Sequence, residues 1–238
     1  MARRRSQGVS WQLIGIVAVL AVFLVAGIIW VASSSGRDDL EPPLIVMMDE
    51  ALDLEAGVSE DGYPVLGSAD APVTFYEFAD FQCPHCKDHH DIYAKRINRD
   101  YVATGKAKMV WVTFAFQGDE SINAAKAGYC ALDQSPEQFW TLHDWLFENQ
   151  AAIANTGGFA PARLALMADQ IGLDVAAFDA CFADPATLER VEAGKAFAIE
   201  KGVESTPSFL VGETLVAGTG EENLVPLRQA LDTASTGE

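Results

Sequence analysis

The first 37 residues contain no acidic side chain, and the stretch from Ser6 to Gly36 contains no charged side chain of either sign. Within it, the apolar run from Leu13 to Ala32 is long enough to cross the ~30 Å hydrocarbon core of a bilayer as a helix. The basic run Arg3–Arg5 precedes it, and basic residues favour the cytoplasmic side. We therefore expect a cytoplasmic N-terminus (1–10) and a transmembrane anchor (11–32). A cleaved signal peptide is the alternative, but its apolar region is usually shorter.

Basic side chains are scarce in the rest of the chain, which we expect to lie outside the cell membrane, in the periplasm or on the outer face. After the expected anchor, 13 basic and 34 acidic side chains leave a formal net charge of −21. Such an acidic surface argues against a nucleic acid partner and against adhesion to anionic lipid. Solubility of an exported domain is a sufficient reason for it.

Cysteine is also rare. The chain has four, and all of them follow the expected anchor: Cys83, Cys86, Cys130 and Cys181. An even number in an oxidising compartment suggests two disulfides, each either permanent or transient. The first two are separated by only a proline and a histidine, so they form a CxxC pair.

The ligands that would turn this pair into a metal or haem site are missing from the sequence around it. A zinc site usually needs a second pair of ligands from another element, whereas His89 and His90 lie on the same predicted helix as the pair. Covalent haem requires histidine directly after the second cysteine, and that residue is Lys87. We therefore expect no metal and no cofactor. Redox exchange is favoured over a purely structural disulfide, because a helix N-terminus lowers the pKa of a thiol.

The pair lies at the start of a helix predicted over residues 84–103. Proline is favoured at the first helical position, so Pro84 makes Cys83 the N-cap, whose sulfur can accept a hydrogen bond from the N–H of Cys86. The positive end of the helix favours a Cys83 thiolate, and so does a protonated His85. Three- and four-residue spacing places Cys86 on the inward face. We expect an exposed attacking thiol at Cys83 and a buried resolving thiol at Cys86.

Regular elements become readable from residue 71 onward, after a polar linker expected over 33–67. Their order is β, α, β, a helical block, β, β, α, which predicts an α/β domain with a helical insertion in its middle. We place this domain over 68–238 and the insertion over about 119–202. The predicted strands lie in 71–78, 106–116 and 207–218, and the predicted helices are 84–103, 121–132, 136–149, 161–171, 175–183, 186–201 and 221–233.

The segment "GSADAPVTFYEFADFQCPHC" resembles the entry strand and active site of the DsbA type of thioredoxin-fold disulfide oxidoreductases, specifically their membrane-anchored bacterial members. "INAAKAGYC" and "FWTLHDWLFENQ" resemble the start of that family's helical insertion, and "GVESTPSFLVGETLVAG" resembles the strand that follows it. The resemblance covers roughly 67–231. It implies a thioredoxin fold with a helical insertion, preceded here by a single transmembrane helix.

The resemblance also implies roles for individual residues. Cys83 is similar to the nucleophile and Cys86 to the resolving cysteine. Glu77 is similar to the family's buried acidic residue that helps to move a proton at Cys86; an outward-facing Glu77 is the alternative. Thr206–Pro207 resembles the cis-proline loop, whose backbone can pair with an extended substrate chain. DsbA itself has valine before this proline, whereas threonine is commoner in the isomerases and in many anchored relatives, a departure that bears on the direction of electron flow.

Cys130 and Cys181 both fall in the expected insertion. If paired, they would close a loop of about 50 residues and restrict the unfolded chain by ~4 kcal/mol on the entropy model. We expect a structural disulfide here; two buried free thiols are the alternative.

These features predict an extracytoplasmic thiol:disulfide oxidoreductase that donates disulfides to reduced exported proteins. The resemblance implies a quinone-linked membrane oxidase as its electron acceptor. One alternative within the same chemistry is a reductase for cytochrome or copper-site assembly. Another is a membrane-tethered accessory subunit of a larger membrane complex, with catalysis secondary or lost. The intact CPHC motif and Thr206–Pro207 argue against that loss, because a pure scaffold has no physical need for them.

Overall fold

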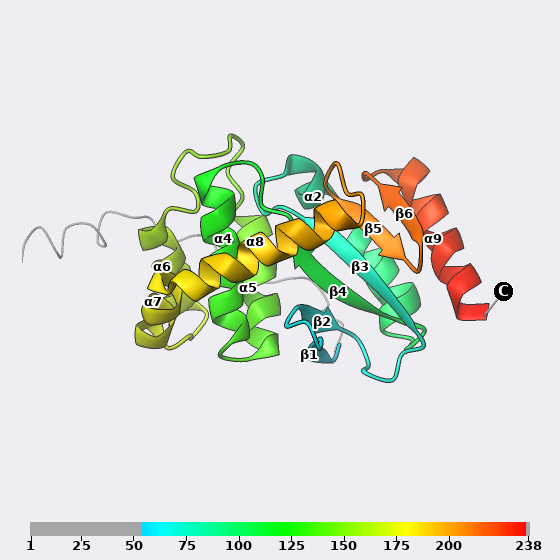
Figure 1. Cartoon of the computed structure of the whole chain (residues 1–238), viewed down its shortest axis with the longest axis horizontal. Helices are drawn as coiled ribbons and strands as arrows, with labels where there is room; N and C mark the ends of the chain where they lie inside the picture. The colour runs from blue at the N-terminus through cyan, green and yellow to red at the C-terminus, as the bar shows by residue number, and fades with distance from the viewer. Residues whose placement is uncertain (1–53, 237–238) are drawn as a thin grey trace, which may run out of the picture. The chain divides into compact units, whose positions relative to one another are not determined.

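The computed structural model describes residues 54–236 (Figure 1). The expected cytoplasmic N-terminus, the anchor over 11–32 and the linker up to residue 53 lie outside the described residues. Between residues 54 and 236, no helix combines the length and the apolar composition that crossing a membrane requires.

A six-stranded mixed sheet has the strand order β1-β2-β4-β3-β5-β6. The central strands β3 and β4 pair in parallel, and every other pair is antiparallel. The strands are β1 (Ala56–Val58), β2 (Pro64–Leu66), β3 (Val73–Ala79), β4 (Ala107–Thr113), β5 (Ser208–Val211) and β6 (Thr214–Ala217).

Helices account for most of the remaining chain. After β3, one continuous helical segment contains two stretches of wider π-helical turns, η1 and η2. The helices are α2 (Pro84–Asp88), η1 (His89–Ala94), α3 (Lys95–Ile97), η2 (Asn98–Val102), α4 (Asp119–Leu132), α5 (Pro136–Glu148), α6 (Pro161–Gln170), α7 (Val175–Ala183), α8 (Pro185–Glu200) and α9 (Glu221–Thr236). The predicted α/β domain with a helical insertion is therefore confirmed, and from β3 onward its elements follow the predicted order.

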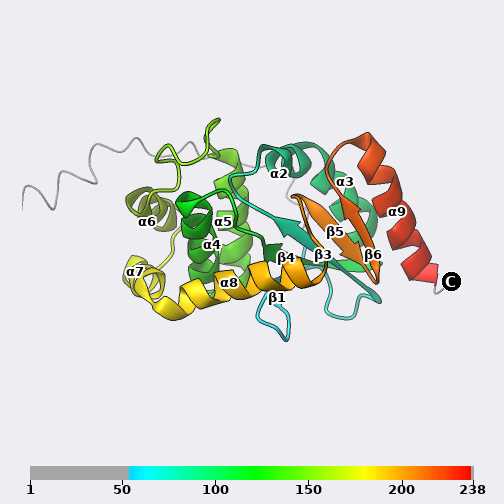
Figure 2. The same cartoon turned by 45° about the horizontal axis from the view of Figure 1, so that its top comes forward.

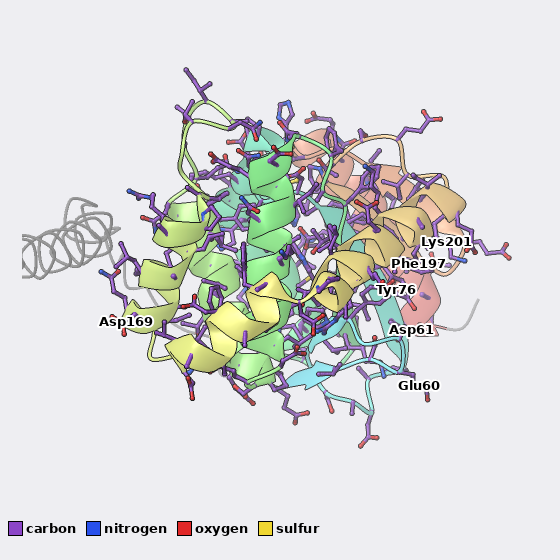
Figure 3. All side chains as sticks on the ribbon, turned by 60° about the vertical axis from the view of Figure 1, so that its left-hand side comes forward. Glu60, Asp61, Tyr76, Asp169, Phe197 and Lys201 are labelled. Carbon is purple, nitrogen blue, oxygen red and sulfur yellow. A yellow bond between two sulfur atoms is a disulfide. The ribbon has the colours of Figure 1, made fainter. Side chains whose placement is uncertain are left out.

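Helices cover both faces of the sheet, because the central strands are apolar on both sides. Figure 2 shows the sheet between α8 on one side and α3 with α9 on the other. On the α8 side, Tyr76 of β3 contacts Phe197 with 5.5 Å between the ring centroids, and Lys201 lies over the same ring (Figure 3). On the opposite side, Phe75 belongs to a core cluster that includes Leu227 of α9. Alternation along β3 thus directs Glu77 to the same side as Phe75.

Side-chain caps determine where several helices of the insertion begin. Ser135 accepts a hydrogen bond from the first turn of α5, Asp174 from that of α7 and Asp184 from that of α8. Proline follows the cap at the start of α5 and α8, where its missing N–H is not needed. These signals explain why the starts of these helices could be predicted to within one residue.

The first two strands correct the predicted linker. Residues 54–67 were expected to belong to it, but β1 and β2 form an antiparallel hairpin, and β2 adds this hairpin to the edge of β4. Its strands have only three residues each, and the apolar residues of β2, Val65 and Leu66, pack on opposite faces of the sheet. The folded domain therefore begins before residue 68.

A disulfide joins Cys130 of α4 to Cys181 of α7, as predicted, and the two residues are 51 positions apart in the sequence. Replacing both residues by alanine should lower the free energy of unfolding by about 4 kcal/mol, because the unfolded chain regains the entropy of an open loop. Urea unfolding of the double variant and of the unaltered protein, both with Cys83 and Cys86 intact, measures the difference. A loss below about 1 kcal/mol would contradict this role.

Candidate active site

Cys83 and Cys86 lie where the central strand β3 meets helix α2. β3 ends at Ala79, and Pro84 occupies the first position of α2, so Cys83 is the extended N-cap residue. The carbonyl oxygen of Cys83 accepts hydrogen bonds from the N–H groups of Cys86 and Lys87, at 3.1 Å each. Both cysteines are free thiols, so the geometry is that of the reduced pair.

Both thiols are buried, which corrects the prediction of a solvent-exposed Cys83. Cys83 is 5% exposed and Cys86 is 1% exposed. As a thiol, Cys83 donates a hydrogen bond from its sulfur to the carbonyl oxygen of Thr206 at 3.4 Å, so a loop far away in the sequence covers it. The two cysteines therefore differ in pKa rather than in exposure.

The pKa values of the two thiols move in opposite directions. A hydrogen bond from the Cys86 thiol is the largest of the effects that lower the pKa of Cys83 to about 6. Burial acts in the opposite direction. The backbone of Cys86 and His85 lowers it further, although Cys83 forms no side-chain cap hydrogen bond of ordinary geometry, contrary to the prediction. Burial is the largest cause that raises the pKa of Cys86 well above its usual value, and the hydrogen bond and the charge of Cys83 raise it further. At neutral pH Cys83 is thus a thiolate and Cys86 a thiol.

The loop that covers Cys83 contains the predicted cis peptide bond between Thr206 and Pro207. The carbonyl oxygen of Pro207 accepts the N–H of Gly218 at 2.7 Å, which joins this loop to the end of β6. The hydroxyl of Thr206 is buried and has no hydrogen-bond partner among the described residues. The structure therefore brings Thr206 and Cys83 together, as the resemblance implied.

Glu77 points into the protein, so the outward-facing alternative is wrong. It is 5% exposed, and its neighbours in register are Trp111 of β4 and Phe209 of β5. Burial raises the pKa of Glu77 to about 8, and the positive charge of His90 offsets only part of this effect. A carboxyl group with this pKa carries a proton at neutral pH and can exchange it there.

A network of histidines and carboxylates lies on the same side of the sheet as Glu77. His90 Nε2 and His143 Nδ1 approach the same oxygen of Asp144, at 3.1 and 2.9 Å, and His90 Nδ1 lies 2.9 Å from Asp91. Burial lowers the pKa of His90, but Asp144 and Asp91 outweigh burial and raise it overall. Burial lowers the pKa of His143, which is packed among aromatic rings.

His85 differs from the other predicted site residues because its side chain is at the surface. Its Nδ1 lies 3.8 Å from Asp88, and the side chain is 72% exposed. Its backbone, rather than its ring, contributes to the low pKa of Cys83. The structure thus places His85 beside the pair, with a ring that a bound polypeptide can reach.

Three residues that the sequence did not single out hold the loop before the pair. Asp80 is fully buried, and its carboxylate accepts four hydrogen bonds from the loop, the segment after β4 and the start of α4. Gln82 donates to Ser121 Oγ at 3.0 Å. Gln150 donates to the carbonyl oxygens of Phe81 and Cys83, at 2.7 and 3.0 Å. Polar residues within the apolar stretch before Cys83 were the available signal for Asp80 and Gln82.

Comparison with known proteins agrees with this fold. A family model described as "Thioredoxin" matches residues 59–232. The crystal structure of oxidised BdbD from Bacillus subtilis superposes with a TM-score of 0.68 and 26% sequence identity, and the match covers 78% of this chain and all of that one.

Curated relatives match over shorter parts of their length. The disulfide bond formation protein D of Bacillus subtilis is 40% identical over 89 residues, which are 37% of this chain and 40% of that protein. The Na(+)/H(+) antiporter NhaA 3 of Salinispora tropica is 30% identical over 162 residues, which are 67% of this chain and 23% of the antiporter. A segment similar to this domain therefore also occurs within a much longer protein named as a transporter.

The low pKa of Cys83 should be visible in the thiolate absorbance of the reduced protein, with a titration midpoint near pH 6. Replacing Cys86 by alanine removes the main stabilising hydrogen bond and should raise the midpoint by roughly one to two units, the worth of a hydrogen bond to a charged group. Cys86→Ser, whose hydroxyl can still donate, should raise it less. Equal midpoints in Cys86→Ala and the unaltered protein would disprove this origin of the pKa.

Glu77→Gln should stabilise the protein in alkaline solution and change little in acid. The pKa of Glu77 in the folded protein is raised from 4.5 to about 8. Its contribution to the free energy of unfolding is therefore most favourable below its pKa in the unfolded chain, and this stability is lost as the pH rises through about 8. The difference in free energy of unfolding should grow from near zero at about pH 4 to on the order of 5 kcal/mol at about pH 9. Urea unfolding across this range tests it, with the exposed Glu189→Gln as a matched control. A difference that does not depend on pH would count against the raised pKa.

Proposed function

The chain belongs to the thioredoxin family, and on this basis we propose that it is an extracytoplasmic thiol:disulfide oxidoreductase that donates disulfides to exported proteins. Cys83 and Cys86 carry the reaction. The observation that supports it most is the opposite shift of the two thiol pKa values within one turn of helix. A structural disulfide has no need for one stabilised thiolate beside a stabilised thiol.

In the proposed reaction the oxidised enzyme meets a reduced substrate. A substrate thiolate attacks the sulfur of Cys83, a new mixed disulfide forms, and the bond between Cys83 and Cys86 breaks. The electron pair leaves on Cys86, which then takes up a proton; Glu77 carries a proton at neutral pH and is assigned as its source. A second substrate thiolate attacks the substrate sulfur of the mixed disulfide and releases Cys83 as a thiolate. Two substrate thiols are oxidised, and the enzyme disulfide is reduced to a dithiol.

The cis-proline loop is assigned to substrate binding. The backbone of Thr206 contacts the sulfur of Cys83, so an extended substrate that pairs with this backbone would bring its cysteine to the site of attack. The exposed ring of His85, two positions after Cys83, is assigned as a second contact for the substrate. These assignments explain why an unfolded polypeptide, rather than a small thiol, is the expected substrate.

The low pKa of Cys83 favours the oxidising direction by a limited amount. At pH 7 a thiol with a pKa of about 6 stabilises the dithiol form by roughly 1.4 kcal/mol, which is about 30 mV for a two-electron couple. The difference between thioredoxin and DsbA is about 150 mV. Other interactions in the oxidised and reduced states must therefore supply most of a strongly oxidising potential.

We assign the chain to the cell membrane, with residues 11–32 as a single anchor, residues 1–10 in the cytoplasm and the domain outside. The support is the uncharged apolar run that follows Arg3–Arg5. A quinone-linked membrane oxidase is proposed to restore the disulfide. The alternative function, a reductase for cytochrome or copper-site assembly, would use the same cysteine pair with electrons flowing in the opposite direction.

A docking role in a larger membrane complex is the second candidate. It is supported by the similarity to a segment within a protein named as an antiporter, from Salinispora tropica. Co-purification of this chain as a stoichiometric subunit would support the docking role.

The redox equilibrium of the pair decides between these functions. The full chain in detergent, with Cys130 and Cys181 intact, is equilibrated with glutathione buffers, and the reduced fraction is measured by thiol alkylation. A potential near about −120 mV is expected for a disulfide donor, and Cys83→Ser should abolish cycling. A potential near about −270 mV would make the protein a reductase. A pair that does not cycle at all would rule out the enzymatic proposal.

A further inference from the structure

Two buried histidines from different helices direct ring nitrogens at one carboxylate oxygen. His90 Nε2, from η1, lies 3.1 Å from Asp144 Oδ1, and His143 Nδ1, from α5, lies 2.9 Å from the same atom. Both histidines are 6% exposed, whereas the side chain of Asp144 is 34% exposed. One ligand atom from each of the three residues lies within 4.8 Å of the other two. We call His90, His143 and Asp144 the His–His–Asp cluster.

In each histidine ring, a proton on the nitrogen that faces away from Asp144 would leave the nitrogen that faces Asp144 free to act as a ligand. Asp91 Oδ1 lies 2.9 Å from His90 Nδ1; with a proton held there, displacement of the second ring proton by a metal ion leaves the lone pair of Nε2 as the ligand. A carboxylate on the second nitrogen is the usual partner of a metal-bound imidazole.

The surroundings of His143 have the same consequence. Its Nε2 is buried and has no hydrogen-bond partner among the described residues. The ring meets the indole of Trp111 nearly perpendicularly, with 4.4 Å between the centroids. A proton on Nε2 can face an aromatic π-system, and the lone pair of Nδ1 then lies in the cluster. Three acceptor atoms would in that case converge without a proton between them, which is the arrangement that a cation requires.

A cavity of about 320 Å³ lies against the cluster and has room for water or another exchangeable ligand. Besides Asp144, the charged side chains that line it are Glu137 and Lys95, while Glu77 lines it with a carboxyl group that keeps its proton at neutral pH. Nearby, Asp91 pairs with Lys87 at 3.1 Å. Carboxylates outnumber ammonium groups around the cavity, so the local composition favours a cation.

We propose that the His–His–Asp cluster binds a divalent transition-metal ion of the Zn²⁺ class, with water from the cavity completing a tetrahedral coordination. Two imidazoles and one carboxylate are donors that zinc accepts, and three protein ligands with one open position are typical of sites that keep an exchangeable ligand. Ligand atoms at ~2.0–2.2 Å from zinc are roughly 3.3–3.6 Å apart in a tetrahedron. The present separations of 3.1 and 2.9 Å from Asp144 Oδ1 would each widen by a few tenths of an ångström, and the two ring nitrogens lie within 4.8 Å of each other.

Within the described part of the chain, His90 belongs to one other cluster of possible ligands, formed with Asp91 and Glu148. That cluster contains one imidazole only, and its Asp91 is already paired with Lys87. Neither cluster includes Cys83 or Cys86. The two clusters can be separated by conservative changes, Asp144→Asn for one and Glu148→Gln for the other.

The test uses the full chain, purified without a polyhistidine tag and stripped of metal with a chelator. The Cys83–Cys86 pair is kept as a disulfide so that its thiolates cannot bind metal. Titration with Co²⁺, followed by visible absorption and calorimetry, should show saturation at one equivalent, no thiolate-to-cobalt charge-transfer band, and displacement by Zn²⁺. His90→Gln and Asp144→Asn should abolish saturable binding, Asp91→Asn should weaken it by about 10- to 100-fold, and Glu148→Gln should leave it unchanged.

Thermal unfolding of each metal-free variant checks that the fold is kept. If His90→Gln does not fold, Asp144→Asn decides the test. The side chain of Asp144 is partly exposed, and asparagine has nearly the same size as aspartate, so this variant should keep the fold. Three results would overturn the proposal: no saturable binding in the unaltered protein, binding that survives Asp144→Asn, or loss of binding in Glu148→Gln alone. The first of these would mean that both rings simply donate hydrogen bonds to Asp144.

Discussion

The buried carboxylate of Asp80 joins the three chain segments that meet at the cysteine pair. Its oxygens accept hydrogen bonds from the N–H groups of Gln82, Phe116 and Gln117, at 2.8, 2.9 and 3.1 Å, and from the hydroxyl of Ser121 at 2.7 Å. These donors belong to the active-site loop, the segment after β4 and the first turn of α4. Burying a charge without such partners costs several kcal/mol. The loop therefore keeps this conformation only while the sheet and the insertion are both in place.

On that support, two cysteines three positions apart acquire opposite acidities. Cys83 lies at the start of a helix, where hydrogen bonds from the Cys86 thiol and from the backbone of Cys86 and His85 stabilise its negative charge. Cys86 lies one turn further in, where burial destabilises the charge. Glu77, on the neighbouring strand, experiences the same burial and keeps its proton at neutral pH. Burial thus keeps the protons on Cys86 and Glu77, whereas hydrogen bonds hold the pKa of Cys83 low in spite of burial.

The sequence predicted what local patterns encode and missed what distant contacts create. Strand β3, the helices of the insertion and the CxxC pair were readable from the residues, whereas the cis-proline was implied by the family resemblance. The β1–β2 hairpin was missed because each strand has three residues in a polar segment. The burial of Cys83 was missed because it depends on Thr206, 123 positions away. His90 and Asp144 are in contact although they are 54 positions apart in the sequence, and no local sequence pattern predicts this contact.

Helix α5 shows that the insertion is part of the active site rather than a separate lid. Trp140 donates to the carbonyl oxygen of Val65 in β2 at 3.0 Å, and the carbonyl oxygen of Phe147 accepts from Lys87 of α2 at 2.7 Å. Directly after the helix, Gln150 holds the backbone of the cysteine loop. In a thioredoxin domain without an insertion, these groups would have no such partners. Changes confined to α5 can therefore alter the electrostatics and geometry of the pair while the CPHC motif, the strand of Glu77 and the cis-proline loop stay the same.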